Sequence, residues 1–246
     1  MSSLIHRIVR QAKIAFLKRS CNELEVAALH KLVAQLTAED VGIGEALFRR
    51  LPHYQAPVLF IPVFDHADFT VTIFVLKQGC RIPLHNHPGM TGILKVLHGS
   101  ARIESFSPMA AQQRSTFSFI FGSASGRNRG GVHAVRHDPV IVSPRDEPCR
   151  LSPSRGNIHE VTADQGGPVA FLDVLSPPYD SGSRDCIYYS LSGNSSTTLA
   201  SGNSPGDEDE RCFLHEVPAP NDFWCNTLPY EGPRLVATSE ENDDLP

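Results

Sequence analysis

The stretch His85-Asn86-His87-Pro88-Gly89-Met90 is the most informative feature of this chain, and it lies between Gly79 and Gly99. Side chains two residues apart on an extended strand point to the same face of that strand. The imidazoles of His85 and His87 can therefore converge on one small cation. The sequence thus predicts a metal site built on a β-strand.

The spacing around these two histidines resembles the first metal-binding motif of the cupin barrels. That motif reads Gly, five residues, His-x-His, three or four residues, Glu, six residues, Gly. In this chain the position of the Glu falls on Thr91 or Gly92, so the carboxylate ligand of the motif is missing. The chemistry of the site therefore depends on which residue completes the ligand set.

A third ligand is expected from a later strand, where the second cupin motif places a Pro and a Gly shortly before a His. Pro153, Gly156 and His159 fit this pattern. A strand that follows a turn at Gly156 would direct His159 inward, and we predict it as the third ligand. The histidines that lack such a context, and that we expect not to be ligands, are His98, His133 and His137.

The length and composition indicate one β-barrel domain with a real core, since the chain has 246 residues and is 41% hydrophobic. A net charge of -5 gives no reason to expect nucleic acid as a partner. No stretch approaches the ~20 apolar residues of a membrane span, and no secretory signal is visible. The six cysteines have no paired spacing, which favours reduced thiols in a cytoplasmic or nuclear protein. We also expect the protein to be a monomer.

The chain divides into segments of different character. We expect a helical segment at 1–50 packed on the barrel, the barrel at 51–191, a flexible linker at 192–211, a segment at 212–236 that packs back on the barrel, and an acidic tail at 237–246. The basic N-terminal residues suit either an amphipathic helix of the domain, which we favour, or a mitochondrial transit peptide. The basic stretch Gly122–Asp138 is interpreted as an exposed loop or insertion.

Strand-like runs alternate with Gly and Pro after residue 57, as is typical of a sandwich or barrel. The predicted fold is therefore all-β, a cupin double-stranded β-helix barrel with short N-terminal helices. The predicted strands are Val58–Phe64, Phe69–Leu76, Ile93–Leu97, Ala101–Phe106, Phe117–Phe121, Val140–Ser143, Asn157–Thr162, Val169–Leu175, Ile187–Leu191 and Phe213–Val217.

Three neutral imidazoles without a carboxylate would leave a divalent metal with its full charge. Imidazole suits Fe, Zn, Cu and Ni, so the ligand type alone does not name the metal. An anionic ligand such as a thiolate would neutralise the site and bind strongly. Fe(II) can activate O2, whereas Zn(II) has no redox chemistry.

Several blocks of the chain together resemble the family of cysteamine dioxygenase and the plant cysteine oxidases. The resemblance covers most of the chain apart from the basic stretch, the linker and the acidic tail, and the C-terminal block favours the animal type. The blocks that carry it are Ser3–Ile8, Ile82–Thr91, Lys95–Ser100, Asn157–Val161, Ala170–Tyr179, Arg184–Tyr189, Asp222–Cys225 and Pro229–Pro233.

The resemblance implies a cupin barrel with Fe(II) held by His85, His87 and His159. Enzymes of the family add both atoms of O2 to a thiolate and form a sulfinic acid. Their substrates are cysteamine, which becomes hypotaurine, and the N-terminal cysteine of peptides and proteins. Oxidation of an N-terminal cysteine creates a degradation signal, so such enzymes can act as oxygen sensors.

The resemblance also implies roles for four further residues. Asp173 matches an acid near the iron that could hold the substrate ammonium, although a turn Asp is the alternative. Tyr179 matches a tyrosine that could donate to bound oxygen species, unless it is a core aromatic. Cys186 and Tyr188 match the positions of a thioether cross-link, for which a buried free cysteine is the common alternative.

Two other functions compete with a dioxygenase. The first is a metal-binding cupin without oxidative chemistry that acts as a binding module. The second is a zinc or manganese cupin isomerase, although such sites usually keep the Glu that is missing here.

Overall fold

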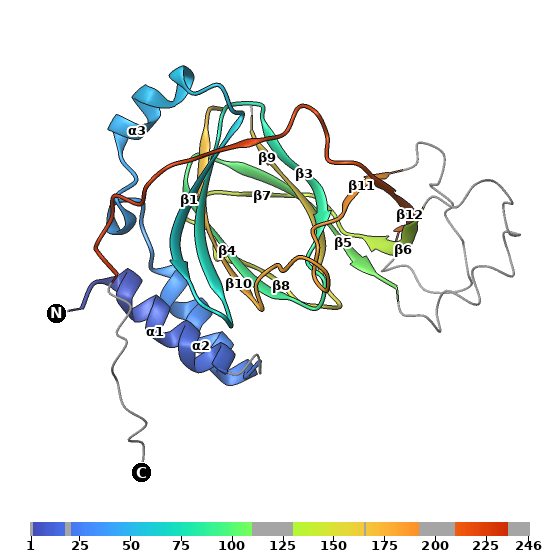
Figure 1. Ribbon diagram of the computed structural model, residues 1–246, viewed down its shortest axis with the longest axis horizontal. Helices are drawn as coiled ribbons and strands as arrows, with labels where there is room; N and C mark the ends of the chain where they lie inside the picture. The colour runs from blue at the N-terminus through green and yellow to red at the C-terminus, as the bar shows by residue number, and fades with distance from the viewer. Residues whose placement is uncertain (1, 18–20, 110–129, 165, 192–209, 236–246) are drawn as a thin grey trace, which may run out of the picture.

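The computed structural model describes residues 2–17, 21–109, 130–164, 166–191 and 210–235. Two sheets face each other and form a barrel, with helices along one side (Figure 1). The first sheet has the order β13 (Cys225–Thr227), β1 (Val58–Asp65), β2 (Thr70–Leu76), β10 (Val169–Ser176), β4 (Thr91–His98) and β8 (Cys149–Leu151). The second has the order β6 (Gly131–Arg136), β12 (Glu210–Val217), β11 (Tyr188–Leu191), β3 (Arg81–Asn86), β9 (Ile158–Ala163), β5 (Ala101–Pro108) and β7 (Val140–Val142).

Strand β10 crosses the middle of the first sheet and is buried along its whole length. Its alternate residues Leu172 and Val174 pack under the helices, whereas Phe171 packs in the barrel interior. Because both faces are covered, the strand is a nearly continuous apolar run instead of an alternating one. The all-β cupin barrel with N-terminal helices is thus confirmed.

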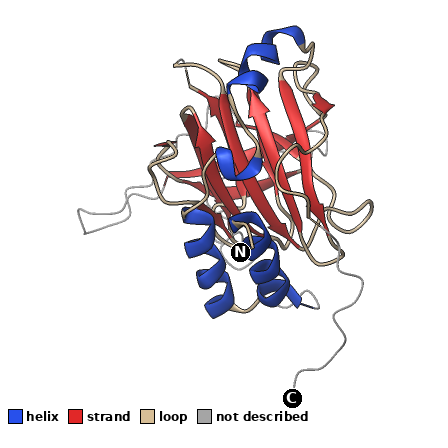
Figure 2. Cartoon of the chain, turned by 90° about the vertical axis from the view of Figure 1, so that its left-hand side faces the viewer, coloured by secondary structure: helices blue, strands red, loops and turns tan. Residues whose placement is uncertain are grey.

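The N-terminal helices cover the outer face of the first sheet, as Figure 2 shows. The basic helix α1 buries one apolar stripe that includes Ile5, Ile8 and Phe16, as expected of an amphipathic helix of the domain. Asn22 caps α2 through its side chain, which accepts from the amides of Leu24 and Glu25. The helical elements are α1 (Leu4–Phe16), α2 (Glu23–Ala34), η2 (Glu39–Val41), α3 (Glu45–Arg50) and η3 (Leu51–His53).

The second sheet departs from the sequence prediction in one respect. Residues 131–136, predicted as part of a loop, form strand β6, which pairs with both β12 and β5 and closes this sheet on itself. The enclosed apolar cluster includes Phe106, Ala134 and Leu214, and its burial explains why the segment is a strand. The sequence prediction also omits the short strands β8 and β13, whereas the equally short β7 is confirmed within the predicted Val140–Ser143. Strand β12 begins at Glu210, inside the predicted linker.

Three predicted features lie outside the described residues. These are the strand Phe117–Phe121, linker residues 192–209 and the acidic tail at 237–246. No helix in the described parts of the chain is long and apolar enough to cross a membrane.

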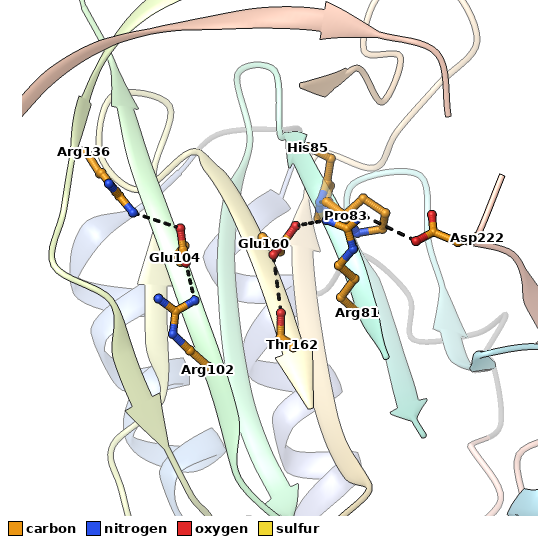
Figure 3. A network of polar contacts seen from close by, with 9 residues as sticks. All are labelled: Arg81, Pro83, His85, Arg102, Glu104, Arg136, Glu160, Thr162 and Asp222. Carbon is orange, nitrogen blue, oxygen red and sulfur yellow. Dashed lines mark hydrogen bonds and ion pairs between the residues drawn. The ribbon is translucent and has the colours of Figure 1, made fainter. Parts of the chain in front are cut away.

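The outer face of the second sheet carries a network of ion pairs (Figure 3). Arg81 lies 2.7 Å from Glu160 and 3.5 Å from Asp222, and Glu104 pairs with Arg136 at 3.4 Å. Such partly exposed pairs contribute little stability. The network does show which way β9 faces. Successive side chains on a strand point to opposite faces, so an outward Glu160 places its neighbour His159 inside the barrel.

Candidate metal centre

Strands β3 and β9 bring the three predicted histidines together. The strands are antiparallel neighbours, and His85 lies directly opposite His159 in their register. Residues opposite each other share one face of a sheet, and a bulge between Ile82 and His85 adjusts the direction of the strand just before the site. All three histidines are buried, and one ligand nitrogen from each lies within 4.8 Å of the others. The part of the chain that the structure describes holds no second cluster of this kind.

Hydrogen bonds fix which nitrogen of two imidazoles faces the centre. The Nδ1 of His85 lies 2.8 Å from the carbonyl of Pro83, which can only accept, so Nδ1 carries the proton. The Tyr179 hydroxyl donates to the carbonyl of Asn86 at 2.6 Å, which leaves its oxygen to accept from the Nδ1 of His87 at 2.8 Å. Both Nε2 atoms therefore present lone pairs, which is how metal-binding histidines are usually oriented.

The protonation of the cluster also fits a metal. Burial lowers the pKa of His85 to about 4. Burial together with the neighbouring imidazoles holds the pKa values of His87 and His159 well below the usual range. The rings are thus neutral near pH 7, as ligands must be. The Nε2 atoms of His87 and His159 lie 3.2 Å apart, within hydrogen-bond distance, so without a cation the Nε2 of His159 can donate to that of His87, and a bound cation would take the place of this proton.

At Gly92, one of the two positions on which the Glu of the motif falls, a side chain would meet apolar neighbours. A Cβ added to Gly92 would lie 2.8 Å from Cδ2 of Leu175 and 2.9 Å from Cγ of Leu151. A carboxylate side chain therefore does not fit at this position without moving two apolar neighbours. Leu175 and Leu151 fill the space beside Gly92, and the ligand cluster consists of three imidazoles.

Asp173 lies at the middle of β10, paired with Leu94 and Thr72 in the adjacent strands. It shares the face of Phe171, which packs in the barrel interior, so its side chain points inward. Burial raises the pKa of this carboxyl to about 7. Its role toward a substrate stays a prediction.

Tyr179 stands behind His87 instead of over the open side of the centre, because its hydroxyl contacts Nδ1 and not Nε2. Burial, with Cys186 and Asp173 nearby, raises the pKa of Tyr179 well above its usual range. The phenol therefore stays protonated and holds its bond to Asn86. A donor role toward bound oxygen species stays a prediction.

The proposed cross-link residues lie beside the same site. Tyr188 is opposite His85 in the pairing of β11 with β3, and the two rings are 6.4 Å apart. Burial raises the pKa of the Cys186 thiol, and hydrogen bonds to the hydroxyls of Tyr179 and Tyr188 oppose that rise. The thiol is thus close to the Tyr188 ring, and the covalent bond itself stays a prediction.

A pocket of about 230 Å³ reaches His159 from the side of the barrel where β8 and β7 form the sheet edges. Its walls are mainly apolar, with Arg150 as the charged residue. The residues that line it include Leu94, Ile103, Ser105, Cys149 and Leu151. This pocket is a path by which a small molecule could reach the centre.

Two functional asparagines were missed by sequence reasoning. Asn157 donates from Nδ2 to the carbonyl of His87 at 2.7 Å and so fixes the strand that carries this ligand. Asn86 connects β3 with β11. No local pattern marks either residue, because their partners are far away in the chain. The histidines predicted not to be ligands are outside the cluster: His98 stacks on Phe48, His133 lies against Phe213, and His137 contacts Ser107.

The family model PCO_ADO matches residues 32–235, which include every strand described above. The chain belongs to the PCO_ADO family. The 2-aminoethanethiol dioxygenase of Mus musculus is 37% identical over 96% of this chain and 98% of its own length. The human enzyme of the same name is 35% identical over 96% and 97%, and plant cysteine oxidase 2 of Arabidopsis thaliana is 27% identical over 85% and 74%.

The PCO_ADO assignment confirms the family that the sequence blocks predicted, and it makes the chain an enzyme of the thiol dioxygenase type with a three-histidine metal site. Solved cupin structures match the barrel more loosely. One example is the cupin domain of a transcriptional regulator from Enterobacter cloacae, 13% identical over 50% of this chain and 98% of its own, with a TM-score of 0.30.

Proposed function

We propose that this chain holds Fe(II) on His85, His87 and His159 and adds both atoms of O2 to a thiol, forming a sulfinic acid. The observation that carries the proposal is the ligand set itself: three buried, neutral imidazoles converge, and the cluster found in the described residues includes no carboxylate. Such a set leaves two positive charges on the metal. A thiolate offsets one of them, so the site favours a thiol that ionises on binding.

Fe(II) bound at this site would supply the electrons that activate O2 and would hold the thiolate sulfur next to it. The residues of the chain supply orientation. The Pro83 carbonyl and the Tyr179 hydroxyl keep two imidazoles in the tautomer that presents Nε2. The apolar barrel wall keeps bulk water from the sulfur.

Asp173 is the group that we assign to the substrate ammonium. Cysteamine and an N-terminal cysteine both carry an amine two carbons from the sulfur, so one carboxylate can serve both. With a pKa raised to about 7, the carboxyl of Asp173 is poised between its two forms, and an arriving ammonium would favour the carboxylate. This interaction would direct the sulfur toward the three histidines.

The substrates that fit are therefore cysteamine and the N-terminal cysteine of a peptide or protein. The pocket of about 230 Å³ beside His159 would take residues that follow the cysteine. If proteins are oxidised in this way, the sulfinate would mark them for degradation in an O2-dependent manner. We expect this to occur in the cytoplasm or nucleus.

The test is to load the full chain anaerobically with Fe(II), add O2, and follow uptake with and without thiol. Cysteamine and an N-terminal cysteine peptide are then offered at equal concentration, and the products are identified by mass spectrometry. We expect thiol-dependent uptake and a product heavier by two oxygen atoms. Absence of thiol-dependent uptake would support a non-oxidative binding module, and purification with tight zinc or manganese would support an isomerase.

A further inference from the structure

We propose that Asn86 is a positioning residue that fixes Ile187 against the metal centre, and with it the flanking Cys186 and Tyr188. The assignment deepens the proposed function and rests on it for its catalytic consequence. Asn86 lies between His85 and His87, yet it does not belong to the ligand cluster. Asn86 acts on the centre through the segment around Ile187, to which it is hydrogen-bonded.

Both backbone polar groups of Ile187 bind to this one residue. The Asn86 amide donates to the Ile187 carbonyl at 3.1 Å, and the Ile187 amide donates to Oδ1 of Asn86 at 2.9 Å. A main-chain and a side-chain group of Asn86 therefore hold Ile187 together. Rotation or displacement of Ile187 would break at least one of these two bonds.

The contact is needed because the regular pairing of the two strands ends here. Strands β3 and β11 share one paired position, Tyr188 with His85, and β11 begins at Tyr188. Ile187 precedes the strand and lies opposite Asn86, whose carbonyl accepts from the Tyr179 hydroxyl while the Ile187 amide donates to Oδ1. The side chain of Asn86 takes the place of the missing ladder bond.

The orientation of the Asn86 amide is fixed by a second partner. Since Oδ1 must accept from the Ile187 amide, Nδ2 faces the other way, where it donates to the hydroxyl of the buried Tyr189 at 3.2 Å. The Asn86 carbonyl meanwhile accepts from Tyr179, whose oxygen contacts His87. Asn86 therefore connects the strand that carries two ligands to the segment that carries Cys186 and Tyr188.

The test compares three variants of the full chain with wild type. Asn86→Ala removes both side-chain bonds. Asn86→Asp keeps an oxygen for the Ile187 amide and can accept from the Tyr189 hydroxyl instead of donating to it. Asn22→Ala is the control, because it also removes two side-chain hydrogen bonds, in this case both to backbone amides, at the α2 cap on the outside of the barrel.

The first measurement is hydrogen exchange of the Ile187 amide in metal-free protein, which does not depend on any activity. Loss of one hydrogen bond predicts exchange faster by about fivefold in Asn86→Ala, with rates near wild type in Asn86→Asp and Asn22→Ala. The second is steady-state kinetics of the iron-loaded enzyme with cysteamine. Misplacement of groups beside the centre predicts that kcat falls about tenfold or more in Asn86→Ala while KM changes little, and that Asn86→Asp restores it.

The inference is overturned if Ile187 exchanges at the wild-type rate in Asn86→Ala, if Asn86→Asp exchanges as fast as Asn86→Ala, or if Asn22→Ala lowers kcat equally. A wild-type chain without thiol-dependent O2 uptake would refute the proposed function instead, and the exchange rates would still decide whether Asn86 holds Ile187.

Discussion

The buried carboxyl of Asp173 predicts a specific dependence of stability on pH. In metal-free protein, we expect Asp173→Asn to unfold at higher denaturant than wild type near pH 8, with a smaller difference near pH 5. Asp173 is 7% exposed, and its pKa is raised from 3.8 to about 7 by burial. The folded state therefore binds the proton more tightly than the unfolded chain does.

The magnitude follows from that shift. A group with a raised folded pKa contributes its full stability below the unfolded pKa, near pH 4, and loses it as the pH rises to about 7. Each pKa unit corresponds to about 1.4 kcal/mol, so the total is about 4 kcal/mol. At pH 5 part of this stabilising contribution of Asp173 is already lost. We therefore expect the stability of wild type relative to Asp173→Asn to fall by about 3 kcal/mol between pH 5 and pH 8.

The assay is urea unfolding of both proteins, followed by fluorescence, at several pH values in the presence of a chelator. The three histidines also change stability with pH, in the opposite sense, because burial lowers their pKa values. Both proteins share that effect, and it cancels in the difference. Asp65→Asn, an exposed change at the end of β1, controls for the substitution itself. A difference between wild type and Asp173→Asn that stays constant from pH 5 to pH 8 would refute the reasoning.

Four further outcomes test the site. His159→Ala is expected to abolish iron binding and turnover, and near-normal iron content by metal analysis would remove His159 from the ligand set. Tyr179→Phe deprives the Nδ1 of His87 of its partner, so we expect a metal affinity about 10-fold to 100-fold weaker in chelator competition, and an unchanged affinity would contradict that role. Asp173→Asn should lower kcat/KM for amine-bearing thiols far more than for a thiol without an amine, and equal losses would disprove the ammonium contact. A thioether between Cys186 and Tyr188 joins Sγ to a ring carbon as O2 takes up two electrons, so the peptide that contains both residues should be lighter by two hydrogens.

Much of the centre could be predicted because its signals are local. Alternation on a strand places His85 and His87 on one face whatever surrounds them, and the turn before His159 sets the direction of the next strand. The apolar runs of β1, β2 and β10 likewise appear in the sequence, since a buried strand needs apolar residues along its length. The absence of a Glu ligand was also visible, although its cause was not.

Other features depend on partners that are distant in the chain. Strand β6 exists because β5 and β12 enclose an apolar cluster with it. The stretch of sequence around it is rich in Gly, Arg and His and gave no clear strand pattern. Short strands β8 and β13 are likewise defined by the edges that they pair with. The position of Tyr179 behind His87 follows from hydrogen bonds across 92 residues of sequence, which no local pattern encodes.

Motif spacing and periodicity, which act over a few residues, were enough to predict the three histidines of the cluster and the barrel, and the resemblance of several blocks was enough to predict the family. How the histidines are held depends on the folded chain. Leu151 and Leu175 pack against Gly92 and would have to move to admit a side chain there, burial raises the pKa of Asp173, and Asn86 binds Ile187 across two strands. Each of these effects arises from atoms brought together by folding, and each vanishes in the extended chain.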